Sequence, residues 1–192
     1  IGRPNSGKST LVNGMLRENR VVASDIPGTT RDAVHVQWQW QGRRVILVDT
    51  AGIKPGAGVP KDRIELAVNE LVEKTVDHSH VVAVLIDCME AFTAIDMKII
   101  QRVLEEGRAL VIVANKWDLI EDRYKRKATK WMDKQLEKGL GQAKAIPITY
   151  VSAKTGLRVD KIMDETLRVY EKWNTRVSTG LLNKWLYEFN KV

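Results

Sequence analysis

Apolar and polar positions along the chain follow two periods, which alternate from the first residues to about residue 173. Apolar residues recur every three or four positions in some segments, which predicts amphipathic helices. In others they alternate with polar residues or run together for five or six positions, which predicts half-buried and fully buried strands. Strands that alternate with helices predict an α/β fold with a doubly wound, mostly parallel sheet and helices on both faces.

The boundaries of the predicted elements follow from these periods and from the turn signals between them. Strands are expected at 34–40, 45–48, 81–86, 109–114 and 146–151. Helices are expected at 8–17, 64–72, 95–106, 125–138, 159–173 and 181–189. A hairpin turn is predicted at 41–44, and residues 20–32 and 53–62 predict loops because they are rich in turn-forming residues.

Composition narrows the class of protein. A chain of 192 residues suits one α/β core with a small appendage. No run approaches the roughly 18 apolar residues of a membrane span, so we expect no membrane partner. Cys88 is the only cysteine, which favours a reducing interior compartment. That compartment would be the cytoplasm of a bacterium, or an organelle interior if the source is eukaryotic. The chain has 31 Lys and Arg against 24 Asp and Glu, a net charge of +7, and this positive charge favours a polyanionic partner.

The first ten residues carry the most specific chemistry, because Gly2, Gly7, Lys8 and Ser9 match the phosphate-loop pattern G-x-x-x-x-G-K-[ST]. The glycines let backbone N–H groups converge on phosphate oxygens, the lysine adds a positive charge, and the serine hydroxyl suits Mg²⁺. The nucleotide-binding residues expected here are Gly2, Asn5, Ser6, Gly7, Lys8, Ser9 and Thr10. A phosphate loop normally follows a buried strand, and only Ile1 precedes Gly2, so we expect the first strand of a P-loop NTPase fold to be missing through N-terminal trimming.

Three further motifs stand at the carboxyl ends of predicted strands. In D-x-x-G, Asp49 would contact Mg²⁺ and Gly52 would reach the γ-phosphate through its N–H. In N-K-x-D, the carboxylate of Asp118 would accept two parallel hydrogen bonds from guanine and would repel adenine. In S-A-K, a backbone N–H would lie near the base oxygen. The base-binding residues expected from the last two motifs are Asn115, Lys116, Asp118, Ser152, Ala153 and Lys154. Together the motifs predict a site for GTP or GDP with Mg²⁺.

With these motifs the chain resembles the translation-factor-type GTPases over almost its whole length. Residues 25–32 are similar to the first switch of the Era, MnmE and Der (EngA) group. The segments most similar to the second G domain of Der are Arg3-Pro4-Asn5, 49–53, 115–119, 176–179 and 182–186. The chain departs from that family at Ser6, where a valine is usual.

The resemblance implies a GTP-hydrolysing switch of a ribosome-assembly GTPase, acting as a monomer on the large ribosomal subunit and its rRNA. It implies a G domain at 1–174 and the start of a KH-like domain at 175–192. Thr30 would meet Mg²⁺ and the γ-phosphate, with Thr29 as the second choice. The implied metal-binding set is Ser9, Thr30 and Asp49, and the implied catalytic set is Asn5, Lys8, Thr30 and Gly52.

The position after D-x-x-G is Ile53, which cannot orient the attacking water as a glutamine does in many GTPases. Arg31 or an arginine from a partner could compensate. We favour a third route, in which the amide oxygen of Asn5 helps to hold a monovalent cation beside the β- and γ-phosphates. The resemblance to potassium-activated members of the group makes K⁺ the expected ion.

Several alternatives stay open from the sequence. The chain could be a GTP-binding module with little hydrolysis, a tRNA-modification GTPase of the MnmE type, or a P-loop ATPase, although Asp118 argues against the last. The basic stretch around 125–134 is either a solvated helix face or an rRNA contact. We expect His78 and His80 to be structural and Cys88 to be a packing residue.

Overall fold

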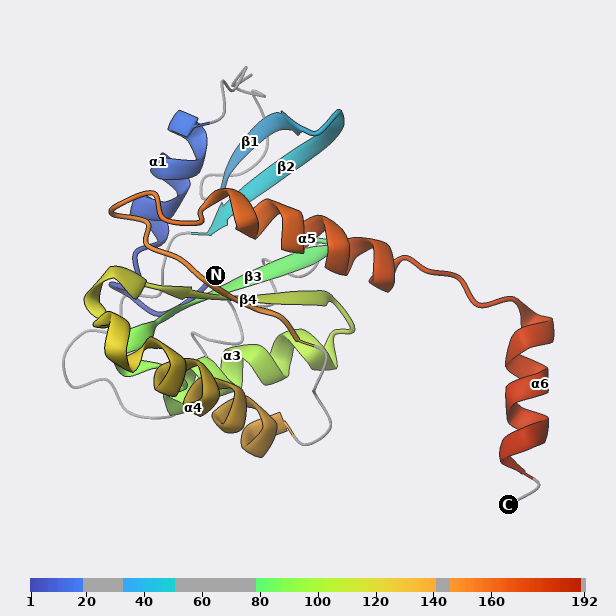
Figure 1. Cartoon of the computed structure of the whole chain (residues 1–192). Helices are drawn as coiled ribbons and strands as arrows, with labels where there is room; N and C mark the ends of the chain where they lie inside the picture. The colour runs from blue at the N-terminus through green and yellow to red at the C-terminus, as the bar shows by residue number, and fades with distance from the viewer. Residues whose placement is uncertain (19–32, 51–78, 141–145, 191–192) are drawn as a thin grey trace.

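The computed structural model describes residues 1–18, 33–50, 79–140 and 146–190 (Figure 1). Its helices are α1 (Lys8–Glu18), α3 (Ala94–Glu105), α4 (Asp122–Leu140), α5 (Asp160–Trp173) and α6 (Thr179–Phe189). Its strands are β1 (Ala33–Trp40), β2 (Arg43–Thr50), β3 (Val81–Asp87), β4 (Ala109–Asn115) and β5 (Ile148–Tyr150). Two short 3-10 turns are η1 (Cys88–Glu90) and η2 (Trp117–Leu119). The predicted loops 20–32 and 53–62 and the predicted helix 64–72 lie outside the described residues.

The core is a parallel sheet in the order β3-β4-β5, with helices on both faces, as predicted. Every residue of β4 is buried, because this central strand is covered on both sides. Even-numbered residues of β3 and β4 pack with α3 and α4, whereas odd-numbered residues pack with α1 and α5. The period of two along each strand therefore divides the core into two layers.

The predicted hairpin is also present, as the antiparallel pair β1–β2. Its two turn residues, Gln41 and Gly42, have φ of 48° and 77°. Positive φ at both central positions is what a two-residue turn between right-twisted strands requires, and glycine adopts it without strain.

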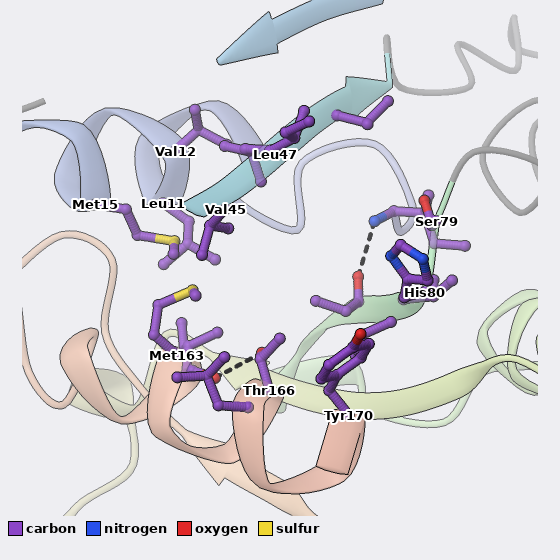
Figure 2. Close-up of a pocket in the computed structure, with 18 of the residues that line it drawn as sticks. Leu11, Val12, Met15, Val45, Leu47, Ser79, His80, Met163, Thr166 and Tyr170 are labelled. Atoms are coloured by element: carbon purple, nitrogen blue, oxygen red, sulfur yellow. Dashed lines mark hydrogen bonds between the residues drawn. The ribbon is translucent and has the colours of Figure 1, made fainter. Parts of the chain in front are cut away.

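An apolar cavity of about 770 Å³ separates β2 from β3 (Figure 2). Side chains of α1, β2 and α5 line it, among them Leu11, Leu47 and Met163. At one end the backbone of Ile1 runs along the edge of β3, where its amino group donates to the Ala83 carbonyl at 2.8 Å and its carbonyl accepts from Leu85 N at 2.8 Å. In the described residues the strands therefore form two sheets rather than one.

The last strand is shorter than its apolar run predicted, since β5 begins at Ile148 rather than at 146. Pro147 has no N–H to donate to a ladder, and it contributes only its carbonyl oxygen, which accepts from Ile112 N at 3.0 Å. Regular pairing with β4 thus starts after the proline.

Helix α6 lies apart from the core, joined to α5 by residues 174–178 (Figure 1). The hydroxyl of Ser178 caps its first turn by accepting from Leu181 N at 3.3 Å. The apolar side chains of this helix are exposed: Leu181, Leu182, Trp185, Leu186, Tyr187 and Phe189. None of the helices described is long and apolar enough to cross a bilayer.

Candidate functional site

The phosphate loop leads from the edge of β3 into α1, and two of its positions admit only glycine. Gly2 has φ 153° and pairs with Leu85, so that an added Cβ would collide with the Leu85 carbonyl oxygen. Gly7 has φ 94°, and a Cβ there would collide with Nδ2 of Asn115. Gly2 is therefore required by its close approach to the backbone of β3 and Gly7 by its close approach to the Asn115 amide, as well as by their conformations.

Polar groups inside the loop bond to its own backbone. The ammonium of Lys8 donates to the carbonyls of Gly2 at 2.9 Å and Arg3 at 2.7 Å. The buried hydroxyl of Ser6 donates to the same Arg3 carbonyl at 2.9 Å, which satisfies it where the related family usually has a valine. Ser9 and Thr10 are exposed in the first turn of α1. Asn5 is exposed, with a left-handed φ of 62°.

Asn115 joins three motifs that are far apart in the sequence. Its side chain is buried at the end of β4, and its Nδ2 donates to the Ser6 carbonyl at 2.8 Å. Its Oδ1 accepts from the backbone N of Ala153 at 2.9 Å. One amide thus ties the phosphate loop and the S-A-K segment to N-K-x-D, and the predicted phosphate and base residues meet at one end of the sheet.

Within N-K-x-D, the neighbours of Asp118 are anchored and its own side chain is exposed. Trp117 is buried, its N donates to the Val151 carbonyl at 2.9 Å, and its ring lies 4.5 Å from that of Tyr150. Lys116 is left-handed at φ 65°, and its ammonium is paired with Asp87 at 2.5 Å. These contacts fix the backbone around a carboxylate that remains open to a ligand.

In S-A-K, two of the three backbone N–H groups are already used. Ser152 N donates to the Leu157 carbonyl at 3.1 Å, and Ala153 N donates to Asn115. The N–H of Lys154 donates to no acceptor among the residues that the structure describes. Lys154 is therefore the best placed of the three to reach a base oxygen.

Arg3 anchors the phosphate loop to the start of α3. Its Nε donates to Oδ1 of Asp96 at 2.9 Å, and a terminal nitrogen donates to the Glu90 carbonyl at 2.8 Å. Asp96 is fully buried, and its other oxygen accepts from the N and the hydroxyl of Thr93, both at 2.9 Å, as part of a capping box. No short motif in the sequence predicts a role for Asp96 or Asp87, although Thr93 and Asp96 have the T-x-x-D spacing of a capping box.

The predicted magnesium ligands are only partly within the described residues. Ser9 is exposed on α1, and the backbone of Asp49 lies in β2 one residue from its carboxyl end. Thr29, Thr30, Arg31, Gly52, Ile53 and His78 lie outside the described residues. Across the described ranges, no three His, Cys, Asp or Glu side chains gather as a metal site of their own.

Two further residues singled out from the sequence have packing contacts. The ring of His80 meets those of Tyr170 at 5.6 Å and Trp173 at 5.9 Å, both edge-on. Cys88 is buried in the core layer shared by α3 and α4. Burial, and then the negative charge of Asp87, raises the pKa of its thiol to about 12.

Comparison with known proteins identifies the family. Residues 1–116 match the family of 50S ribosome-binding GTPases, and residues 68–172 match the GTP-binding domain of elongation factor Tu. The chain belongs to the 50S ribosome-binding GTPase family. It is therefore a GTPase domain, and the predicted P-loop α/β fold is confirmed.

The predicted resemblance to Der is confirmed as well. This GTPase domain is 41% identical over 188 residues to GTPase Der of Parvibaculum lavamentivorans and 39% identical over 186 residues to that of Mesorhizobium japonicum. These stretches cover 98% and 97% of the chain, and 39% and 38% of the relatives. The chain thus spans about two fifths of the length of the curated relatives it matches.

Solved structures with the same fold include a complex with ribosomal RNA, a GTP-binding protein and a translation elongation factor. Era in complex with MgGDPNP and a segment of 16S ribosomal RNA has a TM-score of 0.64 at 25% identity, covering 88% of this chain and 54% of that one. A probable GTP-binding protein EngB has a TM-score of 0.61 at 20% identity, covering 89% and 96%. Elongation factor SelB of Methanococcus maripaludis has a TM-score of 0.66 at 18% identity, covering 93% and 34%.

Proposed function

We propose that this domain binds GTP and GDP, hydrolyses GTP with Mg²⁺, and serves as the switch of a GTPase that assists assembly of the large ribosomal subunit in the bacterial cytoplasm. The observation that carries the proposal is the bridge made by Asn115. Its two hydrogen bonds hold the phosphate loop and the S-A-K segment at the distances given above. A phosphate subsite and a base subsite in one rigid unit are what a nucleoside triphosphate requires.

Each subsite has a distinct chemical task. The loop N–H groups, the dipole of α1 and the charge of Lys8 favour the β- and γ-phosphates. The exposed carboxylate of Asp118 selects guanine, since it accepts from the ring N–H and the exocyclic amine. The N–H of Lys154 donates to the base oxygen.

Mg²⁺ fits the oxygen donors proposed for it. The Ser9 hydroxyl is exposed at the head of α1, and Asp49 and Thr30 complete the proposed set. Hard oxygen ligands suit this ion, and the bound ion would neutralise charge on the β- and γ-phosphates.

Catalysis needs help beyond D-x-x-G, because Ile53 cannot hold a water molecule. We propose that Asn5 contributes its amide oxygen to a K⁺ site. Its exposed side chain and its left-handed backbone at φ 62° in the phosphate loop support this assignment. The cation would offset the charge that develops between the β- and γ-phosphates during hydrolysis.

The proposed partner is the large ribosomal subunit. The description of the family as 50S ribosome-binding GTPases and the net charge of +7 support it. We propose that residues 175–192 begin a KH-like domain, since α6 exposes a broad apolar face. The domain itself is proposed to act as a monomer.

Single-turnover hydrolysis tests the proposed function. With the domain in excess over γ-labelled GTP and with Mg²⁺ present, phosphate should be released in one exponential phase. Removal of Mg²⁺ by a chelator should abolish the release. Tight GTP binding without phosphate release would favour the alternative of a binding module, and failure to bind GTP would refute the proposal.

A further inference from the structure

Helix α4 carries a stripe of positive charge on its solvent face, which we call the basic stripe. It consists of Arg123, Lys127, Lys130, Lys134 and Lys138, all of them exposed. The spacings of four, three, four and four residues place the five side chains within an arc of about 80°. The stripe is about 22 Å long, at 1.5 Å per residue.

The charges of the stripe are poorly neutralised. Arg123 pairs with Glu121 at 2.8 Å, and both of these side chains are largely exposed. None of the four lysines forms an ion pair with another described residue. Asp133 and Glu137 lie along only one edge of the stripe.

This arrangement disfavours the helix itself. Like charges three or four residues apart repel each other, and the stripe contains four such neighbouring pairs. A helix that is stabilised by its surface charges would instead place opposite charges three or four residues apart. The repulsion is relieved when an extended polyanion lies along the stripe.

Two exposed aromatic rings line the other edge of the stripe. Tyr124 and Trp131 are 49% and 46% exposed, and they stand two helical turns apart. The helix packs on the sheet through Met132 and Leu136 instead. The guanidinium of Arg123 lies over one face of the Tyr124 ring, 4.8 Å from its centre, so this ring already holds a cation and keeps its other face for a base.

We propose that the basic stripe, with Trp131 and Tyr124, is an RNA-binding surface of this domain. The lysines would follow the phosphates of a single-stranded or looped segment, and unstacked bases would lie on the two rings. Phosphate contacts together with base stacking are the means by which proteins bind unpaired RNA. The proposal rests on the proposed ribosomal partner and names the part of the domain that meets RNA.

The test measures binding of a fluorescein-labelled oligouridine of about 12 nucleotides by fluorescence anisotropy. Between about 50 and 200 mM KCl, the logarithm of affinity should fall with the logarithm of salt at a slope near −3.5, or about −0.7 for each of five phosphates. Lys127→Gln with Lys134→Gln should bring the slope to about −2 and lower the affinity about tenfold or more at low salt.

A matched control removes the same charge from the opposite face of the sheet. Lys161→Gln with Lys172→Gln changes two exposed lysines of α5, which covers the other core layer. This control should keep both slope and affinity. Trp131→Ala should weaken binding at least fivefold at an unchanged salt slope, and Trp131→Phe should restore most of the loss because stacking needs only a ring.

GTP binding and single-turnover hydrolysis, measured on the same variants, separate this proposal from the proposed function. Both should be unchanged in the α4 variants. Equal losses of RNA affinity in the α4 and α5 variants, or no RNA binding by a domain that hydrolyses GTP, would overturn the surface assignment alone. Binding to vesicles of anionic phospholipid, without binding to oligouridine, would overturn it in favour of a membrane surface. Failure of the unaltered domain to bind GTP would instead count against the proposed function.

Discussion

Replacing Arg3 by methionine tests how the phosphate loop is held. The change removes the guanidinium that donates to Asp96 at 2.9 Å and to the Glu90 carbonyl at 2.8 Å. Methionine keeps an unbranched apolar side chain in place of the methylene groups of arginine. Asp96 is fully buried and would lose its only cationic partner among the described residues. The two bonds from Thr93 would remain.

The expected cost follows from these contacts. Removing one partner of a buried ion pair typically costs about 3–5 kcal/mol, because the remaining charge is left uncompensated. Arg3 is partly exposed and Thr93 still donates to the carboxylate, so we expect the lower end, about 3 kcal/mol. For a domain of this size the midpoint of thermal unfolding should fall by about 6–12 °C.

Urea unfolding measures this free energy, with Arg43→Met as the matched control. Arg43 pairs with Glu171 at 2.6 Å, but both side chains are more than half exposed, so its loss should cost less than about 1 kcal/mol. Adding Asp96→Asn to Arg3→Met should recover part of the stability, because no buried charge is then left alone. Equal costs for Arg3→Met and Arg43→Met would refute the reasoning.

Two further predictions concern a cation and a thiol. GTP turnover should rise when Na⁺ is replaced by K⁺ at constant ionic strength. Asn5→Ala should remove the difference between the two salts while GDP still binds. Equal rates in the two salts for the parent domain would contradict the K⁺ site. Burial holds the pKa of Cys88 at about 12, above its unfolded value of 9.0, so the unfolded thiol ionises first as pH rises. The contribution of this thiol to the free energy of unfolding should be fully present below pH 9 and should decrease as the pH rises above 9. In urea unfolding, Cys88→Ala should therefore lose less stability over that pH range than the parent does.

Much of the fold was predictable because each element shows its own local period. Helix α1 begins at Lys8 as predicted, and β4 lies where a continuous apolar run indicated a strand covered on both faces. The start of β5 was predicted two residues too early, because the apolar run begins before Pro147. Proline has no N–H to donate to a neighbouring strand, so the strand begins after it.

The candidate site was predictable as a set of motifs but not as a network of contacts. Glycines, Lys8 and Asp118 follow from short patterns with a chemical reason at each position. The bond from Asn115 to Ser6 spans 109 residues, and the bond from Arg3 to Asp96 spans 93. Such partners depend on which strand ends the topology brings together, and no local pattern specifies that.

Guanine recognition by Asp118 is the central claim of this account, and one substitution tests it directly. Asp118→Asn replaces an acceptor by a donor, so affinity should move from GTP to xanthosine triphosphate, whose ring offers the complementary carbonyl. Competition of the two nucleotides against a fluorescent GDP measures the preference of the parent and the variant. We predict a reversal of preference in the variant, whereas an unchanged preference for GTP would contradict the assignment.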